Sequence, residues 1–238
     1  MNGEIEKLRD WIEGSKYIVF FGGAGVSTES GIPDFRSVDG LYSQKYDVPP
    51  EVILSHTFFE RNPEVFYRFY RDKLVMDGVK PNQAHIRLAQ MEAQGKLKAV
   101  ITQNIDGLHQ AAGSENVLEL HGSLLRNHCT RCGRKYDLLF MRSNHGVPRC
   151  SCGGIVRPDV VLYEEPLDEK VLTRSMQYIA CADMLIVGGT SLMVYPAAGL
   201  VDYYRGDKLV VINRDESART RGANLFIGGS IGDVFAQV

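Results

Sequence analysis

The chain has 238 residues, of which 44% are hydrophobic and 24% charged, so it can hold one large domain or one domain with a small insertion. Its net charge of −2 gives no reason to expect a nucleic acid or an anionic membrane surface as a partner. Apolar runs such as YIVFF (residues 17–21) are too short to span a bilayer, and the charged, amphipathic N-terminal segment is not a signal peptide, which predicts a cytoplasmic protein.

Short apolar runs alternate with helical patterns along most of the chain. We predict strands at residues 17–21, 98–102, 117–120, 160–162, 184–187, 208–212 and 224–226, and helices at 1–14, 81–94, 168–180, 196–204 and 231–237. Continuous apolar strands are typical of parallel sheets that are covered on both faces. The alternation therefore predicts a doubly wound, mostly parallel α/β sheet.

The first predicted strand runs into a glycine-rich loop, GGAGVSTES, and then into a stretch compatible with a helix. Glycines such as Gly23 and Gly25 let the backbone approach a phosphate, and the hydroxyls of Ser27 and Thr28 add hydrogen-bond donors. The loop is not a complete dinucleotide fingerprint, because Thr28 stands where a third glycine is usual. An ordinary tight turn is the alternative interpretation.

The continuation of this loop, GIPDFR, adds three chemically distinct side chains just beyond the glycines. They are the carboxylate of Asp34, the ring of Phe35 and the guanidinium of Arg36. Pro33 disfavours helical geometry in the residue before it. We therefore expect a loop that can fold over a bound ligand.

Two segments interrupt the alternation. Residues 37–80 contain no predicted strand but carry aromatic-rich helical stretches, and residues 123–156 contain four of the five cysteines and little apolar periodicity. Both segments leave and rejoin the main domain. We expect them to form a smaller lobe over one edge of the sheet, with a ligand site between the lobes.

Polar side chains follow the predicted strand at residues 98–102. Gln103, Asn104 and Asp106 come directly after this apolar run, where burying them without partners would cost free energy. One interpretation is a ligand site at the end of the strand. The alternative is that Asn104 or Asp106 caps a helix that begins near Leu108.

The four clustered cysteines are spaced as two pairs. Cys129 and Cys132 enclose two residues, seventeen residues follow, and Cys150 and Cys152 enclose one. Four thiolates on two short turns fit tetrahedral zinc with no open position, which is a structural site. A zinc ribbon that binds nucleic acid is the less favoured interpretation. For the isolated Cys181 we predict a buried, apolar environment.

Taken in order, GAGVSTESGIPDFR, TQNIDGLH, ELHGS, the two cysteine pairs, GGTSLMVYPAAG and VVIN closely resemble the sirtuins, which are NAD-dependent protein lysine deacylases. The resemblance runs from about residue 5 to the end of the chain. It implies a Rossmann-like NAD-binding domain made of residues 1–36, 81–122 and 157–238. It also implies a small lobe that combines a helical insertion (37–80) with a module (123–156) binding one structural zinc.

The resemblance also implies catalytic roles. The carbonyl oxygen of an acyl-lysine attacks the ribose carbon that carries nicotinamide, and His121 then deprotonates a ribose hydroxyl, so that lysine and O-acyl-ADP-ribose are released. Asn104 would order the ribose and a nearby water, and Asp106 would bind the carboxamide of nicotinamide. The alternative for His121 is an ordinary structural histidine. The remaining positions that the resemblance assigns to NAD are Gly23, Ala24, Gly25, Thr28, Asp34, Phe35, Arg36, Gln103, Ile105, Gly189, Thr190, Ser191, Asn213, Arg214 and Ile231.

For the substrate, the resemblance implies that Val160 walls an acyl-lysine tunnel and that Val194 and Tyr195 pair with an extended peptide. The segment LYEE at residues 162–165 departs from the glycine-containing FGE pattern of the family. Sirtuins that prefer acidic acyl groups carry Tyr-x-x-Arg, whereas here Tyr67 is followed by Tyr70 in the place of the arginine. We therefore expect removal of acetyl rather than succinyl groups.

Acetylated proteins or peptides are the expected partners of a monomer that binds neither membranes nor nucleic acid. Two other functions use the same features. The site could transfer ADP-ribose to a protein, or the chain could be a non-enzymatic nucleotide-binding or zinc-ribbon module. Transfer of label from NAD to protein would indicate the first, and salt-dependent binding of DNA or RNA without release of nicotinamide would indicate the second.

Overall fold

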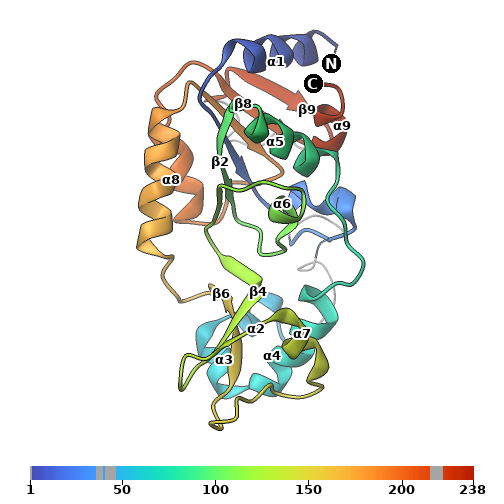
Figure 1. Ribbon diagram of the computed structural model, residues 1–238, viewed down its shortest axis with the longest axis vertical. Helices are drawn as coiled ribbons and strands as arrows, with labels where there is room; N and C mark the ends of the chain where they lie inside the picture. Colours follow the sequence, from blue (N-terminus) through green and yellow to red (C-terminus); the bar gives the residue numbers. More distant parts are fainter. Residues whose placement is uncertain (1, 36–39, 41–46, 215–221) are drawn as a thin grey trace.

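Two sheets organise the fold, one in each lobe of the molecule (Figure 1). The larger has six strands in the order β3-β2-β1-β7-β8-β9, and the smaller has three in the order β5-β4-β6. The structure is a computed structural model that describes residues 2–35, 40, 47–214 and 222–238. Arg36, one of the predicted NAD contacts, lies outside the described residues.

The main sheet confirms the prediction of a parallel, doubly wound fold. Every pair of neighbouring strands in it is parallel. The chain moves outward from β1 to β3 and then returns to the other side of β1, so the order reverses between β1 and β7. Ligands of such sheets bind at this reversal, beyond the carboxyl ends of the strands. The strands are β1 (Ile18–Gly22), β2 (Leu97–Thr102), β3 (Val117–Glu119), β7 (Met184–Gly188), β8 (Leu209–Asn213) and β9 (Leu225–Gly228).

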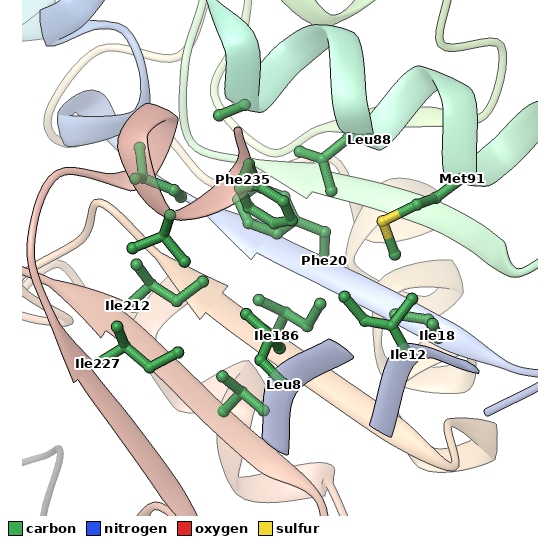
Figure 2. Close-up of a cluster of buried hydrophobic side chains, with 14 of the residues drawn as sticks. Leu8, Ile12, Ile18, Phe20, Leu88, Met91, Ile186, Ile212, Ile227 and Phe235 are labelled. Carbon is green, nitrogen blue, oxygen red and sulfur yellow. The ribbon is translucent and has the colours of Figure 1, made fainter. Parts of the chain in front are cut away.

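Helices cover both faces of the main sheet because alternate residues of its strands point to opposite sides. Ile18 and Phe20 of β1 pack with the apolar faces of α1 (Asn2–Gly14), α5 (Gln83–Ala93) and α9 (Ile231–Phe235). Figure 2 shows this core, in which Phe20 lies beside Phe235. Val19 and Phe21 pack on the other face with α8 (Glu169–Cys181) and η5 (Ala197–Tyr203).

The starts of two of these helices follow from the sequence. The side chain of Asn82 accepts a hydrogen bond from the backbone N–H of Ala84 at the start of α5. Asp168 does the same for Lys170 and Val171 at the start of α8. Such caps satisfy backbone donors that have no partner within the helix.

The small lobe differs from the prediction in its strands. Residues 160–162 do not form a strand of the main sheet; β6 (Val156–Val160) instead pairs antiparallel with β4 (Gly122–Cys129), which also pairs with β5 (Lys135–Tyr136). The register of β4 against β6 shifts between Ser123 and Asn127. This irregularity breaks the two-residue alternation by which a strand is recognised in sequence.

The rest of the small lobe is helical, as its aromatic-rich sequence predicts. Short helices from residues 50–74 pack their rings with the β4–β6 sheet, in a cluster that includes Phe59, Phe66, Tyr67 and Tyr70. They are α2 (Pro50–Ile53), α3 (His56–Arg61), α4 (Pro63–Phe69) and the π-helical turn η4 (Tyr70–Leu74), joined by α7 (Leu138–Ser143) from the cysteine-bearing segment.

Three further findings concern the expectations from the sequence. The glycine-rich loop continues as two single turns of 3₁₀-helix, η1 (Ala24–Val26) and η2 (Thr28–Ser30), rather than as a helix. Cys181 is exposed and not buried, because it ends α8 on the side away from the sheet. Among the described residues, no helix is both long and apolar enough to cross a membrane.

Candidate active site

Many of the predicted NAD positions lie at the carboxyl edge of the main sheet, because they follow the ends of its strands. The backbone joins these strand ends directly. Gln103, after β2, donates its N–H to Gly22 O of β1 at 2.9 Å, and Gly189, after β7, donates its N–H to Ile212 O of β8 at 3.1 Å. The predicted residues from the separate motifs therefore form one edge rather than scattered turns.

Two glycines allow the loops after β1 and β7 to meet. The N–H of Gly25 donates to Gly189 O at 2.8 Å. A Cβ at Gly25 would lie 2.8 Å from the backbone of Gly189, and a Cβ at Gly189, whose φ is +58°, would lie 2.4 Å from the backbone nitrogen of Val26. Side chains at either position would force the loops apart. The structure thus assigns these glycines to loop packing, whereas the sequence indicated only an approach to phosphate.

Thr190, which follows β7, is hydrogen-bonded to residues at the ends of β2 and β8. Its hydroxyl oxygen accepts a hydrogen bond from the side-chain amide of Gln103 at 3.0 Å, and its carbonyl accepts one from the side-chain amide of Asn213 at 3.2 Å. The predicted site residues after β2, β7 and β8 are therefore linked by their own side chains. Gln103 and Asn213 are oriented before any ligand binds.

A second set of hydrogen bonds connects the glycine-rich loop to the end of β2. The hydroxyl of Ser27 donates to Asp106 Oδ2 at 2.7 Å and accepts from the side-chain amide of Asn104 at 3.1 Å. Ser27 is 1% exposed. Asp106 also accepts the N–H of Leu108, the first residue of α6 (Leu108–Ala111), at 2.8 Å, although the N-cap residue of this helix is Gly107.

The sequence indicated both Ser27 and Thr28 as hydroxyl donors of this loop, but only Thr28 was among the positions that the resemblance assigned to NAD. The structure places the Thr28 hydroxyl in a local hydrogen bond to Gly25 O at 3.0 Å. The local sequence does not distinguish the roles of the Ser27 and Thr28 hydroxyls, because the partners of Ser27 lie more than 70 residues further along the chain. Asn82 was also missed: its amide donates to Val26 O at 2.7 Å and so braces the same loop.

His121 lies just after β3, and its hydrogen bonding determines which ring nitrogen carries the hydrogen. Its Nδ1 is 3.0 Å from the carbonyl oxygen of Gln103. Since a carbonyl can only accept, Nδ1 must carry the hydrogen, which leaves Nε2 as an acceptor. Burial lowers the pKa of His121 below its usual value, and the hydrogen bond to Gln103 only partly offsets this. The ring is therefore neutral near pH 7 and able to accept a proton.

The predicted substrate positions all follow His121 in the chain. Val160 pairs with Gly122 across the β4–β6 sheet, and the next residue, Val161, donates its N–H to His121 O at 3.0 Å. Val194 is half-buried and Tyr195 is 61% exposed, in the loop before η5.

The other predicted NAD positions differ in their exposure. Ile231 is only 3% exposed and packs in the core of the main sheet. Ser191 and Arg214 are exposed, and the remaining members are half-buried; these are Ala24, Asp34, Phe35 and Ile105.

A cavity of about 40 Å³ lies where the two lobes meet. Ile32 and Asp106 line it from the main domain, and Leu124 and Leu74 line it from the small lobe. A volume of this size holds one or a few water molecules. Its lining is apolar apart from the carboxylate of Asp106 and the guanidinium of Arg142.

The four clustered cysteines form the predicted metal site. Their sulfur atoms all lie within 4.8 Å of one another, with Sγ distances of 3.5 Å from Cys129 to Cys152 and 3.6 Å from Cys132 to Cys150. A tetrahedron with Zn–S bonds of about 2.3 Å has edges of about 3.8 Å. The donor set and its spacing therefore fit one Zn²⁺, with β4 supplying Cys129 and the loop before β6 supplying Cys150 and Cys152.

Two buried histidines of the main domain were not expected from the sequence. The ring centroids of His85 and His109 are 4.7 Å apart, and His109 also lies 6.0 Å from the ring of Phe20. Among the described residues, neither ring nitrogen of His109 has a hydrogen-bond partner. Burial lowers the pKa of His85 to about 4 and that of His109 to about 3.

These two histidines are expected to make the fold sensitive to acid. Both pKa values are lowered in the folded state, so the unfolded chain binds more protons and the free energy of unfolding falls as the pH drops from about 6.5 toward 3. We expect His109→Phe to flatten this dependence by on the order of a few kcal/mol. Urea unfolding at pH 7 and pH 4.5 measures it, with the exposed His145→Phe as control. An unchanged difference between the two pH values would contradict the assignment.

Comparison with known proteins places these features in one family. Residues 23–196 match the model of the Sir2 family. The chain is 57% identical over 242 residues to an NAD-dependent protein deacetylase of Clostridium perfringens, which covers 100% of this chain and 99% of the relative. It is 56% identical over 239 residues to one of Clostridium acetobutylicum, covering 99% and 98%.

Solved structures agree with this comparison. A structure of Sir2 with a p53 peptide and NAD+ matches with a TM-score of 0.87 and 38% identity, covering 98% of this chain and 96% of the other. A Sir2 variant with a deacetylated p53 peptide and 3'-O-acetyl ADP-ribose matches with a TM-score of 0.90 at 38% identity and the same coverage.

Proposed function

This chain belongs to the Sir2 family, and from that premise we propose that it is an NAD-dependent protein lysine deacetylase whose chemistry takes place at the carboxyl edge of the main sheet. It transfers the acyl group of acyl-lysine to ADP-ribose and releases nicotinamide. The observation that carries the proposal is the placement of His121. Its neutral ring is bound through Nδ1 to the carbonyl of Gln103, a residue whose side chain belongs to the polar cluster of the strand ends, and Nε2 remains as the acceptor.

The residues present at this edge fit NAD. The buried Ser27 and Asn104 and the half-buried Asp106 form a set of donors and acceptors for a polar nucleotide group. Gln103, Thr190 and Asn213 form a second set next to it. When bound, NAD supplies nicotinamide as the leaving group and ADP-ribose as the acyl acceptor. We assign the first set to the nicotinamide side, because it lies beside the cavity lined by Asp106, and the second to the adenosine side.

In this proposal, His121 accepts a proton at Nε2 from the hydroxyl that attacks the acyl carbon. Asn104 orients that part of the ligand through its side-chain amide, which Ser27 already holds. The half-buried Phe35 covers the site from the loop that follows the glycines. These residues orient the reacting groups and exclude water from the site. The protein assists the chemistry of the cofactor in these two ways.

The acyl-lysine enters beside Val160, and an extended peptide pairs with the backbone around Val194 and Tyr195. Support comes from the pairing of Val160 with Gly122, which sets it next to His121 in the sheet. Acetylated proteins are therefore the proposed substrates of a cytoplasmic monomer. We further propose the division into an NAD-binding domain (1–36, 81–122, 157–238) and a small lobe (37–80, 123–156), braced by one zinc on the four cysteines.

A single incubation tests the proposed function. The protein is mixed with NAD and an acetylated peptide, and the products are followed by mass spectrometry. Formation of O-acetyl-ADP-ribose, free nicotinamide and the deacetylated peptide in equal amounts is the expected result. Transfer of ADP-ribose to protein without loss of acetyl groups would instead identify a protein ADP-ribosyltransferase.

We expect acetyl-lysine to be preferred over succinyl-lysine by at least about tenfold in kcat/KM. Tyr67 and Tyr70 are 0% and 1% exposed, and the Tyr67 hydroxyl donates to Val156 O at 2.5 Å. The nearby Arg71 donates to Gly146 O at 2.8 Å in the cysteine-bearing segment. The neighbouring Arg142 is likewise paired, with Asp77 at 2.9 Å, so burying a succinyl carboxylate beside these tyrosines should cost more than the roughly 1.4 kcal/mol that corresponds to tenfold.

This preference is measured with acetylated and succinylated versions of one peptide. A butyryl peptide serves as the control, because it has the length of the succinyl group without its charge. Faster turnover of the succinylated peptide would overturn the prediction.

A further inference from the structure

The loop after β6 links His121 to the helical insertion. We call residues 161–165 the rim loop. At one end Val161 donates its N–H to His121 O, and in the middle Tyr163 donates to Leu54 O while accepting from the N–H of His56, both at 3.0 Å. The rim loop therefore spans from the proposed catalytic base to the start of α3.

Glu164, within this loop, has an unfavourable backbone conformation. Its φ is +76°, and among the described residues Leu192 is the only other residue besides glycines with a positive φ. A glycine would adopt this conformation without strain, and the family pattern usually has a glycine in this segment. A glutamate here is therefore expected to compensate for the strain through its side chain.

The carboxylate of Glu164 makes two hydrogen bonds to α3. Its Oε2 accepts from the backbone N–H of Thr57 at 2.9 Å and from the Thr57 hydroxyl at 2.7 Å. Thr57 is in the first turn of α3, where backbone N–H groups have no partner within the helix and the helix dipole favours a negative charge. Glu164 thus satisfies a donor that the helix cannot satisfy itself.

The next residue, Glu165, also anchors the rim loop. Its carboxylate pairs with both terminal nitrogens of the Arg157 guanidinium, at 2.6 and 2.9 Å, and accepts the N–H of Leu162 at 2.8 Å. Arg157 in turn donates to Val160 O at 2.8 Å. Glu165 Oε1 also lies 2.8 Å from His56 Nδ1 at the start of α3, so both glutamates hold the rim loop against this helix, Glu165 through His56 and Glu164 through Thr57.

We propose that Glu164 is a positioning residue, whose carboxylate latches the rim loop to α3 and thereby sets where an acyl-lysine peptide lies relative to His121. This inference rests on the proposed deacetylase function, because it assigns the rim loop to the substrate site. The latch itself is a property of the hydrogen bonds between Glu164 and Thr57.

The test compares Glu164→Gly with Glu164→Gln. Glycine removes both the backbone strain and the latch, so we expect the KM for an acetylated peptide to rise at least about fivefold, with kcat and the KM for NAD within twofold of the parent protein. Glutamine keeps an oxygen that accepts from Thr57, and its KM should stay within twofold. Glu64→Gln removes an exposed carboxylate from the first turn of α4 and is the matched control.

Hydrogen exchange of the backbone supplies a second measurement that does not depend on activity. In Glu164→Gly the N–H groups of Thr57 and Tyr163 should exchange at least about fivefold faster, while those of the main sheet stay unchanged. An unaltered peptide KM, with or without faster exchange, would overturn the positioning role, as would an equal rise in the control. If the parent protein released no nicotinamide, the proposed function would fail, whereas the exchange rates would still report on the latch.

Discussion

Replacing His121 with alanine is expected to lower the rate of deacetylation by about 10²–10⁴-fold, the usual contribution of a positioned general base. The reason is the Nδ1 hydrogen bond to Gln103, which leaves Nε2 as the nitrogen of the His121 ring that can accept a proton. Because the imidazole is held by one hydrogen bond, to the Gln103 carbonyl, its removal should leave NAD affinity and the thermal midpoint nearly unchanged. Initial rates of nicotinamide release and NAD titration measure the two effects.

The exposed His145→Ala is the control for this prediction. The pH dependence of kcat provides a further check. Burial lowers the pKa of His121, so Nε2 stays unprotonated even below pH 6.5. The rate should therefore fall only when the pH drops through this lowered pKa. Undiminished nicotinamide release in His121→Ala would rule out its role as the base.

Replacing Cys129 with serine is expected to release zinc and to unfold the small sheet. Cys129 is 1% exposed at the end of β4, and its sulfur lies 3.5 Å from that of Cys152. In small peptides the binding of a structural zinc contributes roughly 10–16 kcal/mol, and here that energy holds a module whose β5 has only two residues. Loss of one ligand should therefore remove most of the module's stability.

Metal analysis and thermal unfolding measure this effect. We expect one zinc per chain in the parent protein, much less in Cys129→Ser, and an earlier unfolding transition. Cys181→Ser is the matched control, since Cys181 is exposed at the end of α8 and outside the cluster. A parent protein without zinc, or a Cys129→Ser variant with unchanged zinc content and stability, would refute the structural role of the metal.

Several parts of this protein could be predicted from local sequence. The apolar runs of β1 and β7, buried at every residue, indicate central parallel strands, and Asp168 marks the start of α8 by its side-chain cap. The polar residues that follow the strands were expected at a common edge, because parallel strands end on the same side. The cysteine spacing alone indicated the metal cluster.

Other parts depend on contacts that no local pattern records. The β4–β6 pair was missed because its register shifts within β4, and the site role of Ser27 depends on Asn104 and Asp106, which lie 77 and 79 residues away. The latch of Glu164 on Thr57 joins segments 107 residues apart. Local sequence determines periodicity, caps and ligand spacing, since these act within a few residues. Register, burial and long-range hydrogen bonds are decided only when packing brings distant segments together.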